Sequence, residues 1–262
     1  MDKFVALMHR YCHDYTNCRN LSVCDEIMVP RYTLHMGTHD IVGRDECYKP
    51  AARKQFEQFP GLCLTVNEIV TNGERLVMRF AEHGASLAHD GATAAWSGIG
   101  LYKWDGERLV ENFVEQDYYS RREQLAGGVP KPVEAPAIAP WDAVAQAPDP
   151  AAEAAVRAFL AGGDLAVLPG VVFDDEWTGS PRQRVLEPLG AEIDDLFCAG
   201  DRVAFRIRQH GRLVEDFAGG NVGLVGREVF LHMTGLVTVR HGEIAAARVI
   251  RDRLGLQRRL RG

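Results

Sequence analysis

The two halves of the chain repeat the same order of apolar runs and turns. The segments 72–84 and 199–211 align without a gap, and each has a glycine turn near its start followed by a long, mostly apolar run. Further on, 98–107 and 233–243 repeat a second run that ends at an Asp-Gly or a His-Gly turn. Apolar runs of this length around glycine turns are typical of β-hairpins. Two copies in the same order predict a tandem repeat of one fold.

Helices are predicted ahead of the hairpins in both halves. Five residues near the N-terminus form one helical stripe: Phe4, Leu7, Met8, Tyr11 and Tyr15. Further helices are expected over 21–28 and 44–59, and the second half has one clear helix over 151–160. Helices followed by hairpins predict the α+β class. We expect two tandem cone-shaped α+β barrels, each a curved antiparallel sheet with helices packed on its concave face.

A proline-rich segment separates the two halves. Residues 127–150 hold six of the twelve prolines, so this stretch cannot sustain a helix or a central strand and is expected to be an extended linker. It divides the chain into a first domain at 1–126 and a second domain at 151–262. Trp141 lies within the linker, and its indole is expected to dock on a domain surface.

Both halves end on an apolar strand that is closed by an aspartate and followed by a helix. Asp117 precedes 118–125, and Asp252 precedes 253–260. A carboxylate inside a core is costly unless something uses or satisfies its charge. Two interpretations stay open: Asp117 is a general acid or base whose pKa is raised by burial, or both aspartates are helix N-caps.

Composition narrows the classes of partner. The formal net charge is -6, which argues against nucleic acid or an anionic membrane as the main partner. No apolar run approaches the length of a transmembrane helix, and no secretory signal is found, so a cytoplasmic location is expected. The six cysteines never form Cys-x-x-Cys and are expected to be reduced thiols. No metal site or phosphate loop is predicted: His35 and His39 have no further ligand nearby, and the glycine-rich segment 218–221 is expected to be a hairpin turn.

The order of motifs in the first half resembles the SnoaL-like branch of the nuclear transport factor 2-like superfamily. The motifs are Tyr32-Thr33-Leu34-His35, Gly43-Arg44-Asp45, the turn at Asn72-Gly73, and the strand ending Glu111-Asn112-Phe113 with Asp117. The resemblance covers the first half nearly end to end and the second half from about Ala191. It implies a cone-shaped barrel, frequent homodimers and a cofactor-free pocket used for proton transfer. Polyketide cyclases, ketosteroid isomerase-like enzymes and lyases of lignin-derived diarylpropanes use such pockets, while other members are non-catalytic binding or dimerisation modules.

Three residues are candidates for catalysis in the first half. Asp117 is the candidate base or acid, and His35 matches a position where the resemblance implies a pocket histidine. His83 lies beside Glu82 on a long strand, although His210 repeats it in the second half and favours a structural role. Glu82 becomes Gln209 in that half, which is the change expected if the first pocket alone needs a carboxylate.

The remaining candidates would bind substrate. They are Tyr11, Tyr15, Tyr32, Glu82, His89, Trp96 and Phe113. The aromatic residues could equally be plain core, and His89 could be a solvated turn residue. The second half has no tyrosine, so its site is expected to be degenerate.

The leading hypothesis is a cofactor-independent acid/base enzyme for a small, apolar, aromatic substrate. Elimination by a lyase or dehydratase is favoured over cyclisation or isomerisation, because many acids and hydrogen-bond donors gather in one half. The alternative is a non-catalytic ligand-binding or dimerisation module in which Asp117 and Asp252 are both caps. A homodimer is a further expectation.

Overall fold

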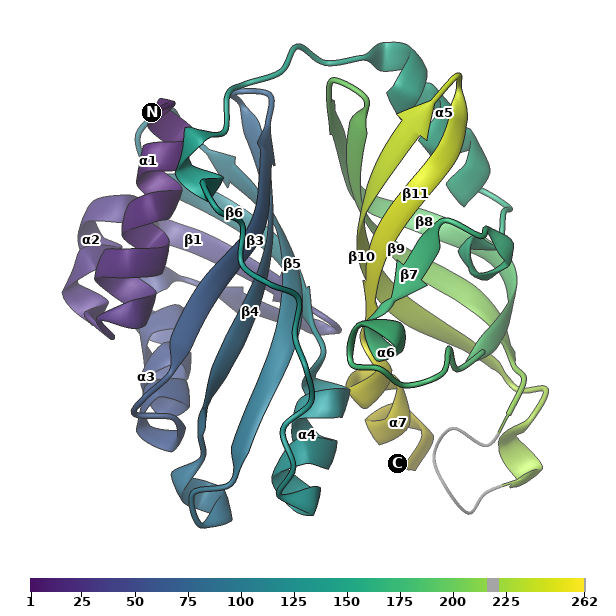
Figure 1. Cartoon of the computed structure of the whole chain (residues 1–262), viewed down its shortest axis with the longest axis horizontal. Coiled ribbons are helices and arrows are strands. Elements are labelled where there is room, and N and C mark those ends of the chain that lie inside the picture. The colour runs from purple at the N-terminus through teal and green to yellow at the C-terminus, as the bar shows by residue number, and fades with distance from the viewer. Residues whose placement is uncertain (216–221, 262) are drawn as a thin grey trace.

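The computed structural model describes residues 1–215 and 222–261 and has the expected α+β architecture (Figure 1). Two sheets carry helices, one sheet in each half of the chain. The turn expected at 218–221 lies outside the described residues. The turns expected at Asn72-Gly73, Asp105-Gly106, Gly200 and His241-Gly242 all join antiparallel strands, so these hairpins are confirmed.

The first sheet has six strands in the order β2-β1-β6-β5-β4-β3. Its strands are β1 (Met28–Met36), β2 (His39–Val42), β3 (Cys63–Thr71), β4 (Arg75–Ala85), β5 (Thr93–Trp104) and β6 (Leu109–Gln116). Only the β1–β6 pair is parallel. The helices are α1 (Lys3–Arg10), the π-helix η1 (Tyr11–Asn17), η2 (Leu21–Val23), α2 (Cys24–Ile27), η3 (Arg44–Tyr48), α3 (Lys49–Gln58), η4 (Leu87–His89) and α4 (Tyr118–Gly127).

The second half repeats this order with a shorter N-terminal part. Its sheet runs β7-β11-β10-β9-β8, and the β7–β11 pair is again parallel. The strands are β7 (Val171–Phe173), β8 (Leu186–Ala199), β9 (Arg202–Leu213), β10 (Glu228–Arg240) and β11 (Glu243–Arg251). The helices are α5 (Pro150–Leu160), η6 (Leu165–Val167), α6 (Asp174–Trp177), η7 (Val222–Leu224) and α7 (Arg253–Arg261).

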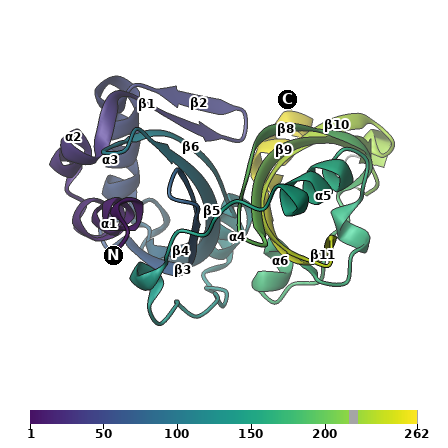
Figure 2. The ribbon, with the colours of Figure 1, turned by 90° about the horizontal axis from the view of Figure 1, so that it is seen from above.

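The two sheets meet back to back. Figure 2 shows both as curved layers, with α1 and α3 inside the curve of the first and α5 inside the curve of the second. An apolar cluster joins the two convex faces and includes Ile99, Leu101 and Phe113 from one half with Phe197 and Ile250 from the other. The second half therefore covers the convex face of the first and leaves the concave face to the helices.

The linker runs back along the edge of the first sheet before it crosses to α5 (Figure 1). The backbone N–H of Ala137 donates to the Val66 carbonyl, and that of Gln146 donates to the Thr71 carbonyl. A 3-10 turn, η5 (Pro140–Asp142), places Trp141 against His9 and His13 of the N-terminal helices. The docking expected for Trp141 is confirmed.

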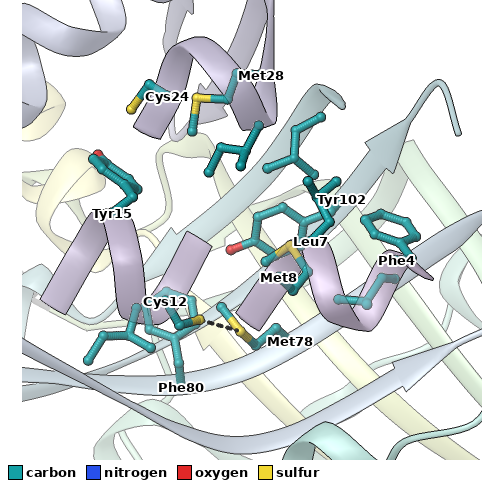
Figure 3. Close-up of a cluster of buried hydrophobic side chains, with 14 of the residues drawn as sticks. Phe4, Leu7, Met8, Cys12, Tyr15, Cys24, Met28, Met78, Phe80 and Tyr102 are labelled. Carbon is teal, nitrogen blue, oxygen red and sulfur yellow. Dashed lines mark hydrogen bonds between the residues drawn. The ribbon is translucent and has the colours of Figure 1, made fainter. Parts of the chain in front are cut away.

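Apolar and aromatic side chains from the helices and the sheet fill the upper part of the first cone. Figure 3 shows Phe4 and Met8 of α1 packed beside Met78 of β4 and Tyr102 of β5. All six cysteines are free thiols, as expected.

Candidate functional site

The concave side of the first sheet encloses a cavity of about 180 Å³. Helices η1, η3 and α3 form one wall, and strands β1, β4, β5 and β6 form the other. The polar residues of its lining are Tyr11, Tyr15, Thr16, Tyr48, Gln55, Glu82, Tyr102, Asn112, Gln116 and Tyr118. A mostly apolar pocket with a few convergent polar groups is the usual form of a small-molecule site.

Glu82 is the carboxylate of this cavity. It lies on β4 and is 5% exposed. Burial raises the pKa of Glu82 to about 7, against the opposing influences of Arg121, Gln55 and Trp96. The side-chain amide of Gln55 donates a hydrogen bond of 3.0 Å to Oε2 of Glu82. A carboxyl group with a pKa near neutrality can both accept and return a proton at working pH.

Tyrosine hydroxyls form a connected cluster in the same cavity. The Tyr15 hydroxyl donates to the Tyr48 hydroxyl at 3.0 Å, and the Tyr11 hydroxyl lies 3.3 Å from the same oxygen. Burial raises the pKa values of Tyr11, Tyr15, Tyr48 and Tyr102. These hydroxyls therefore stay protonated. Tyr15 gives its one hydrogen to Tyr48, which leaves the Tyr48 hydroxyl to donate to a substrate oxygen.

Two carboxamides of β6 also face the cavity. The Trp96 indole N–H donates to Oε1 of Gln116 at 2.7 Å, which fixes that side chain. Asn112 is 1% exposed and lines the cavity. It also adjoins the buried Tyr32 hydroxyl: burial raises the pKa of Tyr32, and a hydrogen bond with Asn112 opposes this.

Glycines on β5 make room for the aromatic floor of the cavity. A Cβ at Gly98 would overlap the ring of Phe80, and a Cβ at Gly100 would lie 2.8 Å from the ring of Tyr102. Phe80 and Tyr102 both line the cavity. The Gly-x-Gly pattern on this strand therefore serves packing.

The equivalent space in the second half is filled. About 20 Å³ remains there among the described residues, next to Gln209, Leu231 and Arg251. Arg251 occupies the position of Gln116 and forms buried ion pairs with Asp174 at 2.7 Å and Asp175 at 2.6 Å. The second half is degenerate as a pocket, as its composition suggested.

The structure brings some of the predicted residues together. Tyr11, Tyr15 and Glu82 line the cavity. Tyr32 and Trp96 point to the same side of the sheet but are fully buried behind the lining, Tyr32 against Tyr48 and Trp96 against Phe59.

His35 and Phe113 lie on the opposite face of the sheet, so their predicted places in the pocket are wrong. Successive side chains of a strand alternate between faces, and Leu34 and Asn112 are the neighbours that face the cavity. His35 is bound to Asp40 at 2.6 Å and Glu111 at 3.1 Å, and its ring stacks on Phe113. The hydrogen bond to Glu111 is the main cause that raises the pKa of His35.

Asp117 also lies outside the cavity, at the junction between the halves. Its Oδ1 accepts a hydrogen bond from the Ser120 backbone N–H at 3.0 Å, which caps α4, and another from Arg253 at 3.0 Å. Burial raises the pKa of Asp117 to about 6. Asp252 caps α7 in the same way through the Gly255 N–H at 2.8 Å. The capping interpretation describes both aspartates.

Neither His83 nor His89 lines the cavity. His83 follows Glu82 on β4 and therefore points to the other face. His89 bonds to the Ser86 hydroxyl at 2.9 Å in the turn after β4. The predicted site roles of both histidines have no support in the geometry.

Sequence analysis missed Tyr48, Gln55, Tyr102 and Asn112. Tyr48, Ala52, Gln55 and Phe56 share a helical stripe, and this spacing could have identified one wall of the cavity. Asn112 alternates with Glu111 and Phe113, and no feature of the sequence shows which set faces inward.

In the described ranges 1–215 and 222–261, no group of three or more His, Cys, Asp or Glu side chains is arranged to hold a metal ion. Over the same ranges no helix is both long and apolar enough to cross a membrane.

Part of the chain is similar to several solved structures. No family model matches the sequence, and no curated protein matches it. A "putative polyketide cyclase" from Acidithiobacillus ferrooxidans is 20% identical, with 47% of this chain and 94% of that chain covered and a TM-score of 0.42. A "Putative SnoaL-like polyketide cyclase" from Jannaschia sp. CCS1 is 17% identical, with 47% and 90% covered and a TM-score of 0.41. TsrD from Streptomyces laurentii is 19% identical, with 48% and 97% covered and a TM-score of 0.43.

These structures each cover somewhat less than half of the chain and nearly all of their own length. The sequence identity to each of them is low, and their names describe those proteins.

Proposed function

We propose that the first half is an acid/base enzyme that moves a proton on a small, apolar, aromatic substrate, with Glu82 as the base. One observation carries the proposal: a buried carboxyl group with a pKa near 7 lies in a cavity that tyrosine hydroxyls also line. Active sites are places where burial shifts a carboxyl pKa toward neutrality. The filled counterpart in the second half carries Gln209 at the same place.

The chemistry that suits this arrangement is proton removal from a carbon next to a carbonyl group. The Glu82 carboxylate takes the proton, and the electron pair of the C–H bond moves so that negative charge develops on the carbonyl oxygen. Hydroxyl donors that already face the cavity stabilise that oxygen. Return of the proton to a different carbon completes an isomerisation, and attack of the new carbanion on a second carbonyl completes a cyclisation.

Elimination has less support than this chemistry. The preference for a lyase rested on several acids in one pocket, and His35 and Asp117 lie outside it. Glu82 is the one carboxyl group that lines the cavity among the described residues. A single carboxyl group that gives back the proton it takes fits isomerisation or cyclisation better.

The cavity limits the size of the substrate. A volume of about 180 Å³ is close to the roughly 150 Å³ apolar cavity that accepts benzene in other proteins. The site therefore suits one aromatic ring with a short side chain. A two-ring diarylpropane exceeds it.

Hydrogen–deuterium exchange tests the proposal without knowledge of the natural product. Acetophenone in D2O is incubated with the protein, and loss of the methyl proton signal is followed by NMR. We expect faster exchange with the protein than without it, and a loss of about 100-fold or more in Glu82→Gln, in line with the size of general-base effects. Asp117→Asn is the matched control and should keep the exchange. Equal exchange in Glu82→Gln and the unchanged protein would overturn the proposal.

A second candidate function is a non-catalytic ligand-binding module. The observation that favours it is that Asp117 and Asp252 both cap helices. In this case acetophenone raises the melting temperature, because a ligand of the native state stabilises it, but its exchange is not accelerated.

A further inference from the structure

Arg121 of α4 is half-buried and differs from the fully buried arginines of the described residues, which all form ion pairs. Its guanidinium lies 4.1 Å from the ring centre of Tyr118, 4.9 Å from Trp96 and 5.5 Å from Phe59. Within residues 1–215 and 222–261, no hydrogen bond or ion pair engages this guanidinium. Aromatic faces hold the cation in place, and its charge is left without a carboxylate contact.

The aromatic rings place this charge next to the cavity. Trp96 is the direct cross-strand neighbour of Glu82 in the β4–β5 pair, and Tyr118 lines the cavity. Arg121 is the cation whose charge acts most strongly on Glu82.

The second half supplies an internal comparison. Gln209 pairs with Leu231 across β9 and β10 as Glu82 pairs with Trp96. When the strands ending at Asp117 and Asp252 are aligned, Leu256 takes the place of Arg121. The carboxylate, the indole and the guanidinium are thus all replaced in the half whose cavity is filled. Both halves keep the aspartate that caps a helix, and this capping requires none of these three side chains.

We infer that Arg121 is a positioning residue for Glu82: Trp96, Tyr118 and Phe59 hold its charge where it compensates the carboxylate before proton transfer. This inference rests on the proposed function. When Glu82 takes a proton, its negative charge passes to the substrate oxygen in the cavity. Arg121 lies behind Tyr118, which lines that cavity, so its charge acts on the substrate oxygen from outside the lining.

Other groups face Glu82 and must be considered in any pH experiment. They are Gln55 of α3, Tyr11, Cys12 and Tyr15 of η1, Tyr102 of β5, and Tyr118 of α4. Burial raises the pKa values of the tyrosines and of Cys12, so these groups stay neutral while Glu82 titrates. Among the described groups that act on Glu82, Arg121 is the one that carries a charge during this titration.

The test is the titration of Glu82 itself. The protein is labelled with ¹³C at the glutamate side-chain carboxyl carbon, and the Glu82 signal is assigned from its absence in Glu82→Gln. We expect Arg121→Gln to move the titration midpoint of Glu82 upward by on the order of one pH unit, and Arg121→Lys to restore most of the original value. Arg122→Gln is the matched control, because Arg122 lies over Tyr119 on the next position of the same helix.

An unmoved midpoint in Arg121→Gln, or an equal movement in Arg122→Gln, would overturn the inference. Arg121→Leu provides a second variant if Arg121→Gln folds poorly, since Leu256 occupies the corresponding position in the second half. The titration does not depend on turnover. A moved midpoint without proton exchange on acetophenone would therefore refute the proposed function and leave the electrostatic role of Arg121 standing.

Discussion

Replacement of Glu82 by Gln should stabilise the protein at neutral and alkaline pH. Glu82 is buried, so the charge on its carboxylate lowers the free energy of unfolding. A glutamine keeps nearly the same shape, and its amide oxygen can still accept the hydrogen bond from Gln55. Gln209 already occupies the equivalent position in the second half.

The magnitude follows from the pKa of Glu82, which burial raises from 4.5 to about 7. Because the folded state binds this proton more tightly than the unfolded chain, the free energy of unfolding falls as pH rises from about 4.5 to about 7. Each pH unit of difference is worth about 1.4 kcal/mol, so the full effect is about 3.5 kcal/mol. Below pH 4.5 both states are protonated and the effect is absent.

Urea unfolding of both proteins at pH 5 and pH 8 measures this effect. We expect the free energy of unfolding of Glu82→Gln, relative to the original protein, to be higher at pH 8 than at pH 5 by about 2 kcal/mol. Other titrating groups cancel, because both proteins carry them. Glu57→Gln, on the exposed side of α3, is the control and should show no such difference. The same relative stability at both pH values would refute the assignment of Glu82 as a buried carboxyl group with a raised pKa.

Three further outcomes follow from the structure. Asp117→Asn should lower the free energy of unfolding by about 1–3 kcal/mol, because Arg253 loses a buried partner. The proton exchange of acetophenone should persist in this variant. Loss of exchange would restore Asp117 as a catalytic candidate. Gly98→Ala should lower the free energy of unfolding by about 1–3 kcal/mol, because the new Cβ overlaps Phe80. It should also weaken acetophenone binding in a thermal-shift titration. An unchanged melting temperature would show that the Phe80 ring has room to move. Trp141→Ala should lower stability by about 1–3 kcal/mol, because the indole packs on His9 and His13; Val144→Ala, at an exposed linker position, is its control and should have little effect.

The tandem fold could be predicted from the sequence because its signals are local. Glycine turns, strand lengths and helix spacing depend on residues close together in the chain. The repeated turns at Gly73 and Gly200 fixed the relation of the two halves before any contact was known.

The site was harder to predict because both faces of the first sheet are buried. In β6 Asn112 and Val114 face the cavity while Phe113 and Glu115 face the second half, and all four are buried, so exposure does not distinguish the two faces. A displacement of one residue exchanges the two faces. The sequence therefore predicts His35 and Phe113 in the pocket and gives no sign of Asn112. The sequence also leaves the role of Asp117 open, since its partner Arg253 lies 136 positions away.

The covalent joining of two back-to-back sheets allows the halves to change independently. In a pair of identical subunits every substitution occurs twice, so a mutation that fills one pocket fills the other as well. Here Gln209, Leu231 and Leu256 could arise without any change at Glu82, Trp96 or Arg121. One half is thus free to improve its packing while the other keeps an open interior. Duplication followed by fusion removes this symmetry, so a substitution can change one cavity and leave the other as it was.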